Sequence, residues 1–117
     1  MPARPYFSMM LELTQADNGK SVEARPGDLI IIRLPENPTT GFRWTVDKMD
    51  SLRVEAQGSS FSVARDAAVG GGGERTFSFK VKGEGGAGNI GLQLRRQWEG
   101  DASVVERYGV TVNVRNT

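Results

Sequence analysis

The 117-residue sequence contains no cysteine and no histidine. Without cysteine the chain has no disulfide, no thiol nucleophile and no thiolate zinc or iron–sulfur site. Without histidine it has no imidazole base, no Ser-His-Asp triad and no histidine-bound metal. The carboxylates are scattered, and no spacing pairs two of them for acid–base chemistry. We therefore expect a binding protein and not an enzyme, with neither a cofactor nor a metal.

An excess of charge and a long apolar run are also missing. There are 15 Lys+Arg against 14 Asp+Glu, a net charge of +1, and this balance disfavours a nucleic-acid partner. No stretch has the length needed to cross a bilayer, so no membrane partner is expected. Residues 1–10 lack the apolar core of a signal peptide. Localisation stays open: periplasmic or secreted if a signal peptide has been removed, otherwise cytoplasmic.

Glycine is abundant, with 15 residues, and the segments between the glycine-rich turns alternate in polarity. Residues 108–114 show the alternation well, since Tyr108, Val110, Val112 and Val114 face one way. Residues 29–34 form an apolar, largely β-branched run typical of a central strand. The other predicted strands cover residues 7–13, 21–24, 42–47, 52–57, 77–81 and 90–95.

The alternation weakens over residues 58–73, which end in four glycines, and this stretch is predicted to be a long loop. Seven to eight short antiparallel strands with turns between them predict an all-β, two-sheet sandwich. We expect a single domain over residues 1–117, with about residues 1–6 forming a loose N-terminal segment. Sandwich loops gather at the two ends of the sheets, so function is expected in the loops.

Two glycine patterns resemble phosphate-binding motifs. Residues 83–88 match G-x-G-x-x-G, but a strand pattern follows them where the dinucleotide motif needs a helix. A hairpin turn is the better interpretation. Residues 70–73 are followed by Glu74 and Arg75 where a P-loop requires Lys and Ser or Thr.

Two other loops carry residues suited to binding. The first is Asn37, Pro38, Thr39, Thr40, Gly41 and Phe42, in which proline stiffens the chain and glycine permits a sharp turn. The second is Arg96, Gln97 and Trp98, which places a large aromatic residue beside cations, as in many binding hot spots. Taken alone, each loop is better explained without a binding role: residues 37–42 as a plain turn, and Trp98 as a side chain folded back over the sandwich edge.

Three segments together resemble the binding loops of the chagasin-like inhibitors of papain-family cysteine peptidases. These are the N-P-T-T-G-F loop, the glycine run, and the R-x-W element, which occur in the family's order and approximate spacing. The resemblance covers most of the chain. It implies an immunoglobulin-like β-sandwich whose three loops form a wedge at one end and fill the peptidase cleft.

The resemblance also implies a role for each loop. Thr39 and Thr40 would lie near the catalytic Cys–His pair of the peptidase, and Arg96 and Trp98 would pack on the primed side. The glycine loop would run along the non-primed subsites through backbone contacts. Its residues are Gly70, Gly71, Gly72 and Gly73.

Gln97 stands where the family usually has proline. The loss of proline loosens the free loop, which is expected to weaken binding by about 0.5–1 kcal/mol without abolishing inhibition. The expected function is reversible, competitive inhibition of a papain-family cysteine peptidase by a chain that is monomeric when free. The alternative is an immunoglobulin-like adhesion or carbohydrate-binding module that uses an exposed Trp98.

Overall fold

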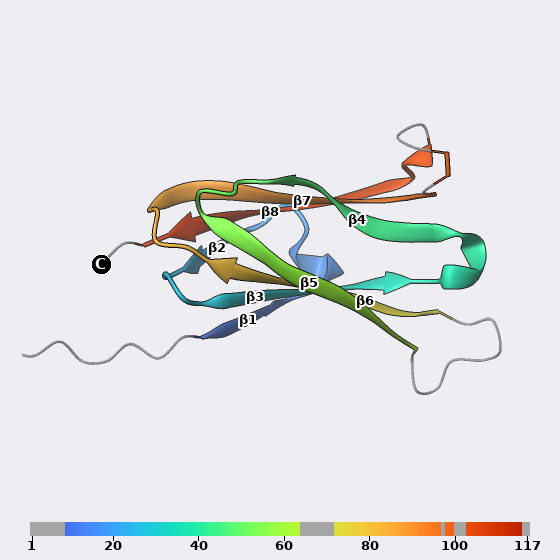
Figure 1. Cartoon of the computed structure of the whole chain (residues 1–117), viewed down its shortest axis with the longest axis horizontal. Helices are drawn as coiled ribbons and strands as arrows, with labels where there is room; N and C mark the ends of the chain where they lie inside the picture. Colours follow the sequence, from blue (N-terminus) through green and yellow to red (C-terminus); the bar gives the residue numbers. More distant parts are fainter. Residues whose placement is uncertain (1–8, 64–71, 97, 100–102, 116–117) are drawn as a thin grey trace, which may run out of the picture.

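The computed structural model describes residues 9–63, 72–96, 98–99 and 103–115, and these form two packed four-stranded sheets (Figure 1). The all-β sandwich predicted from the sequence is therefore confirmed. No helix in the described part of the chain is long and apolar enough to cross a membrane. Sheet A has the order β1 (Met10–Leu13), β3 (Leu29–Glu36), β6 (Gly73–Val81) and β5 (Val54–Val63). Sheet B has the order β2 (Ser21–Ala24), β8 (Glu106–Val114), β7 (Gly86–Arg96) and β4 (Phe42–Met49).

The long strands pair antiparallel, as expected, but the two short edge strands do not. β3–β6, β5–β6, β4–β7 and β7–β8 are antiparallel, whereas β1 pairs parallel to β3 and β2 parallel to β8. The reason lies in the connections, because the chain crosses between the sheets after β1 and again after β2. A short 3₁₀ turn, η1 (Gln15–Asp17), begins the first crossing, so neither connection is a hairpin within one sheet.

The core lies between the sheets and follows the predicted alternation. Tyr108, Val110, Val112 and Val114 of β8 are all at most 6% exposed. They face buried residues of β3 and β6 in the other sheet and, in their own sheet, adjoin those of β7. The latter groups include Ile30, Ile32, Leu34, Phe77, Phe79, Val81, Ile90 and Leu92.

The predicted loop over residues 58–73 is wrong at residues 58–63 and at residue 73, which belong to strands. β5 continues to Val63, and β6 begins at Gly73. β5 is an edge strand and its residues from 55 to 60 are all exposed, so no buried face imposes an alternating pattern on Gly58 and the serines that follow it. Residues 64–71 lie outside the described part of the chain.

Turns at residues 17–19 and 25–28 separate the first three strands, with Gly19 and Gly27 in the left-handed region at φ of +84° and +94°. β7 begins earlier than expected, at Gly86, so the glycine-rich connection after β6 is shorter than residues 83–88. β8 is tied to the start of η1, since the Tyr108 hydroxyl donates to the Thr14 carbonyl at 2.9 Å. Burial, together with the nearby Asp17 carboxylate, raises the pKa of Tyr108 to about 12.

The links from β3 to β4 and from β7 to β8 leave their strands at one end of the sandwich (Figure 1). The link from β3 to β4 contains a second 3₁₀ turn, η2 (Pro38–Thr40), and the link from β7 to β8 carries Trp98. β5 ends and β6 begins at the same end, where Gly73 pairs with both Glu36 and Val63. We call this the loop end, and define it as residues 37–42, 72–73, 96 and 98–99.

Candidate functional site

The loop that joins β3 to β4 is held in shape by its own side chains. The Asn37 side-chain oxygen accepts hydrogen bonds from the Thr39 amide at 3.0 Å and from the Thr39 hydroxyl at 2.6 Å. The Thr40 hydroxyl donates to the Asn37 carbonyl at 2.7 Å. Pro38 stands at the first position of the 3₁₀ turn, where its missing N–H costs nothing. Thr39 and Thr40 therefore sit at the exposed tip of a turn that is ordered without a partner.

Gly41 ends this turn in the left-handed region, at φ of +81°. Its absent side chain leaves room for Trp98, because a Cβ built on Gly41 would lie 2.5 Å from Cη2 of the indole. The Trp98 ring thus lies directly against the Gly41 backbone. The side chain is nevertheless 73% exposed, so most of a large aromatic surface faces solvent at the loop end.

Arg96 joins the same two loops from the strand side. Its guanidinium carbon lies 4.5 Å from the centroid of the Phe42 ring, and Phe42 is also its cross-strand partner. Arg96 further pairs with Glu99 at 3.1 Å, within the loop that carries Trp98. This cation–π contact and ion pair fix the base of the loop relative to the end of β4.

Ser103 closes the loop between β7 and β8. Its hydroxyl accepts from the Arg96 amide at 2.9 Å and donates to the Arg96 carbonyl at 3.0 Å. The sequence analysis did not single out Ser103, because a serine in a polar loop carries no signal of its own. It could have been found only by knowing which residue faces it across the loop.

Gly72 and Gly73 pack closely on their neighbours. A Cβ on Gly72 would lie 3.2 Å from the Glu36 carbonyl, and one on Gly73 would lie 2.2 Å from the Ser62 carbonyl. Gly73 would also meet the Phe61 ring, at 2.6 Å. Gly73 is thus required by close backbone approach, and Gly72 leaves little room for a side chain beside the start of the 37–42 loop.

A buried ion pair lies directly beneath the loop end. The Glu36 side chain, only 2% exposed, accepts from Arg75 at 2.9 Å and from the Trp44 amide at 2.7 Å. The Trp44 indole N–H in turn donates to the Pro35 carbonyl at 2.9 Å. Because Trp44 belongs to sheet B and the other residues to sheet A, these bonds join the two sheets where the 37–42 loop leaves them. We call Glu36, Arg75 and Trp44 the clasp.

The sequence analysis missed the clasp. Glu36 is 8 residues from Trp44 and 39 from Arg75, so no local pattern connects them. One signal was present: Glu36 follows a mostly apolar run typical of a central strand, where a charged residue must either leave the core or find a partner.

The structure brings most of the predicted site residues to one end of the sandwich. Those are Asn37, Pro38, Thr39, Thr40, Gly41, Phe42, Gly72, Gly73, Arg96 and Trp98. Gly70, Gly71 and Gln97 lie outside the described residues. A cleft of about 360 Å³ adjoins Trp98 and Phe42. Within the described ranges, no group of three or more acidic side chains could hold a metal ion.

A sandwich that presents a stiff threonine turn and an exposed tryptophan at one end has the arrangement of a binding protein, since sandwich loops gather where a rigid scaffold can present them to a partner. Residues 23–112 match the family model described as chagasin family peptidase inhibitor I42. The chain belongs to the chagasin family of peptidase inhibitors.

Individual relatives agree with this assignment. Chagasin from Trypanosoma cruzi is 32% identical over 108 residues, which cover 87% of this chain and 96% of that protein. The crystal structure of the cysteine protease inhibitor EhICP2 from Entamoeba histolytica superposes with a TM-score of 0.80 at 20% identity, over 95% of this chain and all of that one. PbICP-C, solved in complex with falcipain-2, has the same fold, with a TM-score of 0.65 at 13% identity over 97% and 96% of the two chains.

The family membership decides between the functions that the sequence left open. The prediction of an inhibitor of cysteine peptidases, and not an enzyme, is confirmed, as is the predicted class of partner. The predicted resemblance and the sandwich fold are confirmed as well.

Proposed function

We propose that this chain inhibits papain-like cysteine peptidases reversibly and competitively, by inserting its loop end into the active-site cleft. Thr39 and Thr40 approach the catalytic Cys–His pair of the peptidase. The loop that includes Gly70–Gly73 follows the non-primed subsites, and Arg96, Gln97 and Trp98 cover the primed side. The contact between Trp98 and Gly41 supports this proposal most strongly, since it makes one continuous surface of two loops.

The order of the 37–42 loop supports tight binding. Association costs free energy for every loop and side chain that must be immobilised, and a loop already held in shape avoids that cost. Here three hydrogen bonds to Asn37 hold both threonines, and the clasp anchors the strand on which the loop begins. The threonine turn can therefore enter a cleft without first being ordered.

Occlusion is sufficient as a mechanism. The chain has no thiol that could react with the peptidase, and no bond needs to be made or broken. A standard protein interface buries about 800 Å² per partner, an area that the end of a small sandwich can supply. The substrate is excluded because the same cleft cannot hold both chains.

The test is a titration of active papain with the purified protein, followed on a fluorogenic peptide. We expect saturable inhibition that weakens as the substrate concentration rises, and intact inhibitor recovered afterwards. Thr39→Ala with Thr40→Ala, and Trp98→Ala separately, should each raise the inhibition constant at least tenfold, because hot-spot truncations typically cost about 2 kcal/mol or more.

The matched control is Leu52→Ala. Leu52 is also a large exposed apolar residue, at 63% exposed, but it lies between β4 and β5 at the opposite end of the sandwich. Its removal should leave the inhibition constant unchanged. Unaltered inhibition by all the loop variants would refute the proposed role of the loop end, and so would digestion of the protein in place of inhibition.

A further inference from the structure

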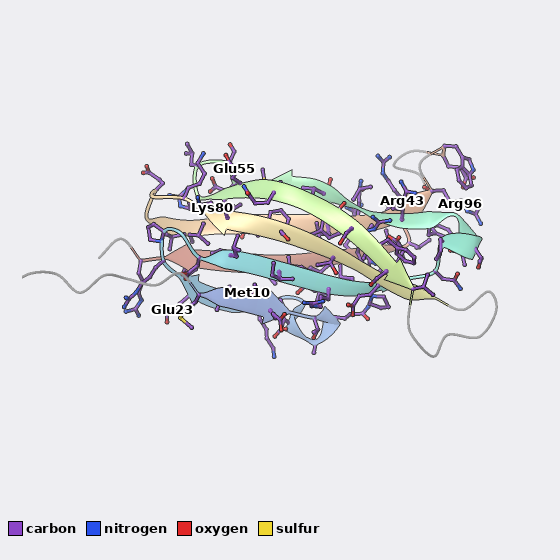
Figure 2. All side chains as sticks on the ribbon, turned by 60° about the horizontal axis from the view of Figure 1, so that its bottom comes forward. Met10, Glu23, Arg43, Glu55, Lys80 and Arg96 are labelled. Carbon is purple, nitrogen blue, oxygen red and sulfur yellow. The ribbon has the colours of Figure 1, made fainter. Side chains whose placement is uncertain are left out.

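The outer faces of the two sheets differ in charge. On sheet A the charges are balanced: Arg33 lies 2.8 Å from Glu12 and 3.6 Å from Glu74, and Lys80 is the cross-strand partner of Glu55. Figure 2 shows Lys80 and Glu55 close together on this face. These opposite charges cancel at a distance, so sheet A attracts neither an acidic nor a basic partner strongly.

Sheet B carries an excess of positive charge on its outer face. Side chains alternate along a strand, so the neighbours of the inward-facing Trp44, Leu92 and Tyr108 point outward. Two acidic residues of the described ranges lie on this face, and each has a basic partner: Asp47 lies 3.6 Å from Arg107, and Glu23 of β2 pairs with Arg115. The outward cations are Arg43, Lys48, Arg95 and Arg107, and we call them the basic face.

The position of Arg43 on this face is not explained by the stability of the sheet. Arg43 and Arg95 stand directly opposite each other on β4 and β7, and like charges in that position are destabilising. Within the part of the chain that the structure describes, no ion pair links Arg43 to an acidic residue. The exposed Arg43 therefore keeps its charge available to an approaching molecule.

The basic face continues into the loop end. Arg43 follows Phe42 in the chain, and Arg95 precedes Arg96, whose guanidinium covers the Phe42 ring. Figure 2 shows Arg43 and Arg96 together at that end of the sandwich. A peptidase that receives the loop end in its cleft would thus bring one rim of the cleft close to these cations.

We propose that the basic face steers this inhibitor onto peptidases whose surface beside the cleft is acidic. The inference rests on the proposed function and adds the charge of the preferred target. Charges at the rim of an interface act mainly on the association rate and on its dependence on salt. Their reach is about 10 Å at 0.1 M salt, so the effect should appear at low ionic strength and vanish at high.

The experiment uses two forms of one peptidase: papain, and papain whose lysines have been succinylated while its catalytic thiol is protected. Succinylation turns each ammonium into a carboxylate and so makes the surface acidic. The thiol is released with a reductant, which does not affect an inhibitor that has no cysteine. Association and dissociation rate constants are measured at several salt concentrations.

The test variant is Arg43→Glu with Arg107→Glu, both at exposed positions. The control is Lys80→Glu with Lys82→Glu. It changes the net charge by the same amount as the test variant, but at the end of β6 that lies away from the loop end. Lys80 is seven residues from Gly73, roughly 23 Å along the strand. Melting curves establish that both variants are folded.

We expect wild type and the lysine control to bind succinylated papain faster than papain, and the arginine variant to lose about tenfold in association rate on the succinylated enzyme at low salt. Its dissociation rate should change little. Equal rates for the arginine variant and the lysine control on both enzymes would overturn the inference while leaving inhibition intact. If wild type failed to inhibit unmodified papain at any salt concentration, the proposed function would fall, and this inference with it.

Discussion

At the scale of single residues, the site depends on a side chain that is absent. Gly41 adopts a left-handed conformation, and Trp98 occupies the space where any other residue would carry its Cβ. Either requirement alone favours glycine. Together they link the shape of the threonine turn to the position of the exposed tryptophan, although Gly41 and Trp98 are 57 positions apart in the chain.

Gly41→Ala tests this link. The left-handed conformation should cost about 1–2 kcal/mol of the free energy of unfolding, and the added methyl must also displace the indole. We expect the inhibition constant for papain to rise at least tenfold and the tryptophan fluorescence to change. The measurements are inhibition assays, urea unfolding and emission spectra.

Gly19→Ala is the matched control. Gly19 has nearly the same backbone conformation, at φ of +84°, but nothing lies within 4 Å of its added Cβ. This variant should lose similar stability and retain full inhibition. If Gly41→Ala inhibited as well as Gly19→Ala, the contact with Trp98 would not be what shapes the site.

At the scale of elements, alternation predicted the buried strands well and the exposed edge poorly. One face of β8 lies in the core, so a buried, largely apolar residue recurs at every second position. β5 lies at an edge of its sheet, and few of its side chains beyond Val54 are buried. Ser59 and Ser60 therefore show no alternating pattern that would indicate a strand. The parallel pairing of β1 with β3, and of β2 with β8, could not be predicted from local sequence patterns either. It depends on where each connection crosses between the sheets.

The clasp supports the loop end through the ends of three strands, β3, β4 and β6. Arg75→Met would leave the Glu36 carboxylate buried with the Trp44 amide as its remaining hydrogen-bond donor. Breaking a buried pair in this way costs about 3–5 kcal/mol. We expect a loss of that order in urea unfolding, and weaker inhibition of papain because the 37–42 loop loses its anchor.

Two further variants make this prediction specific. Arg33→Met removes two exposed ion pairs, with Glu12 and Glu74, from β3, the strand that carries Glu36, and should cost less than about 1 kcal/mol. Adding Glu36→Gln to Arg75→Met removes the buried charge but keeps an acceptor for Trp44, so the double variant should be more stable than Arg75→Met alone. Equal losses from Arg33→Met and Arg75→Met would show that the clasp contributes nothing special.

At the scale of the whole molecule, the sequence predicted which loops matter better than how they are held. Asn37, Pro38 and Thr39 are consecutive, so the stiffness of this loop could be predicted from the local sequence. The clasp and the Ser103 closure join residues that only folding brings together. The residues of the loop end could thus be predicted from the sequence, whereas the contacts that support it, in the clasp and at Ser103, could not.

A crystal structure of the complex with papain would show whether the loop end occupies the peptidase cleft. We expect Thr39 and Thr40 beside the catalytic Cys–His pair, with Trp98 on the primed side and residues 50–53 far from the enzyme. A complex held together through the outer face of either sheet, or with the loop end in solvent, would contradict this expectation.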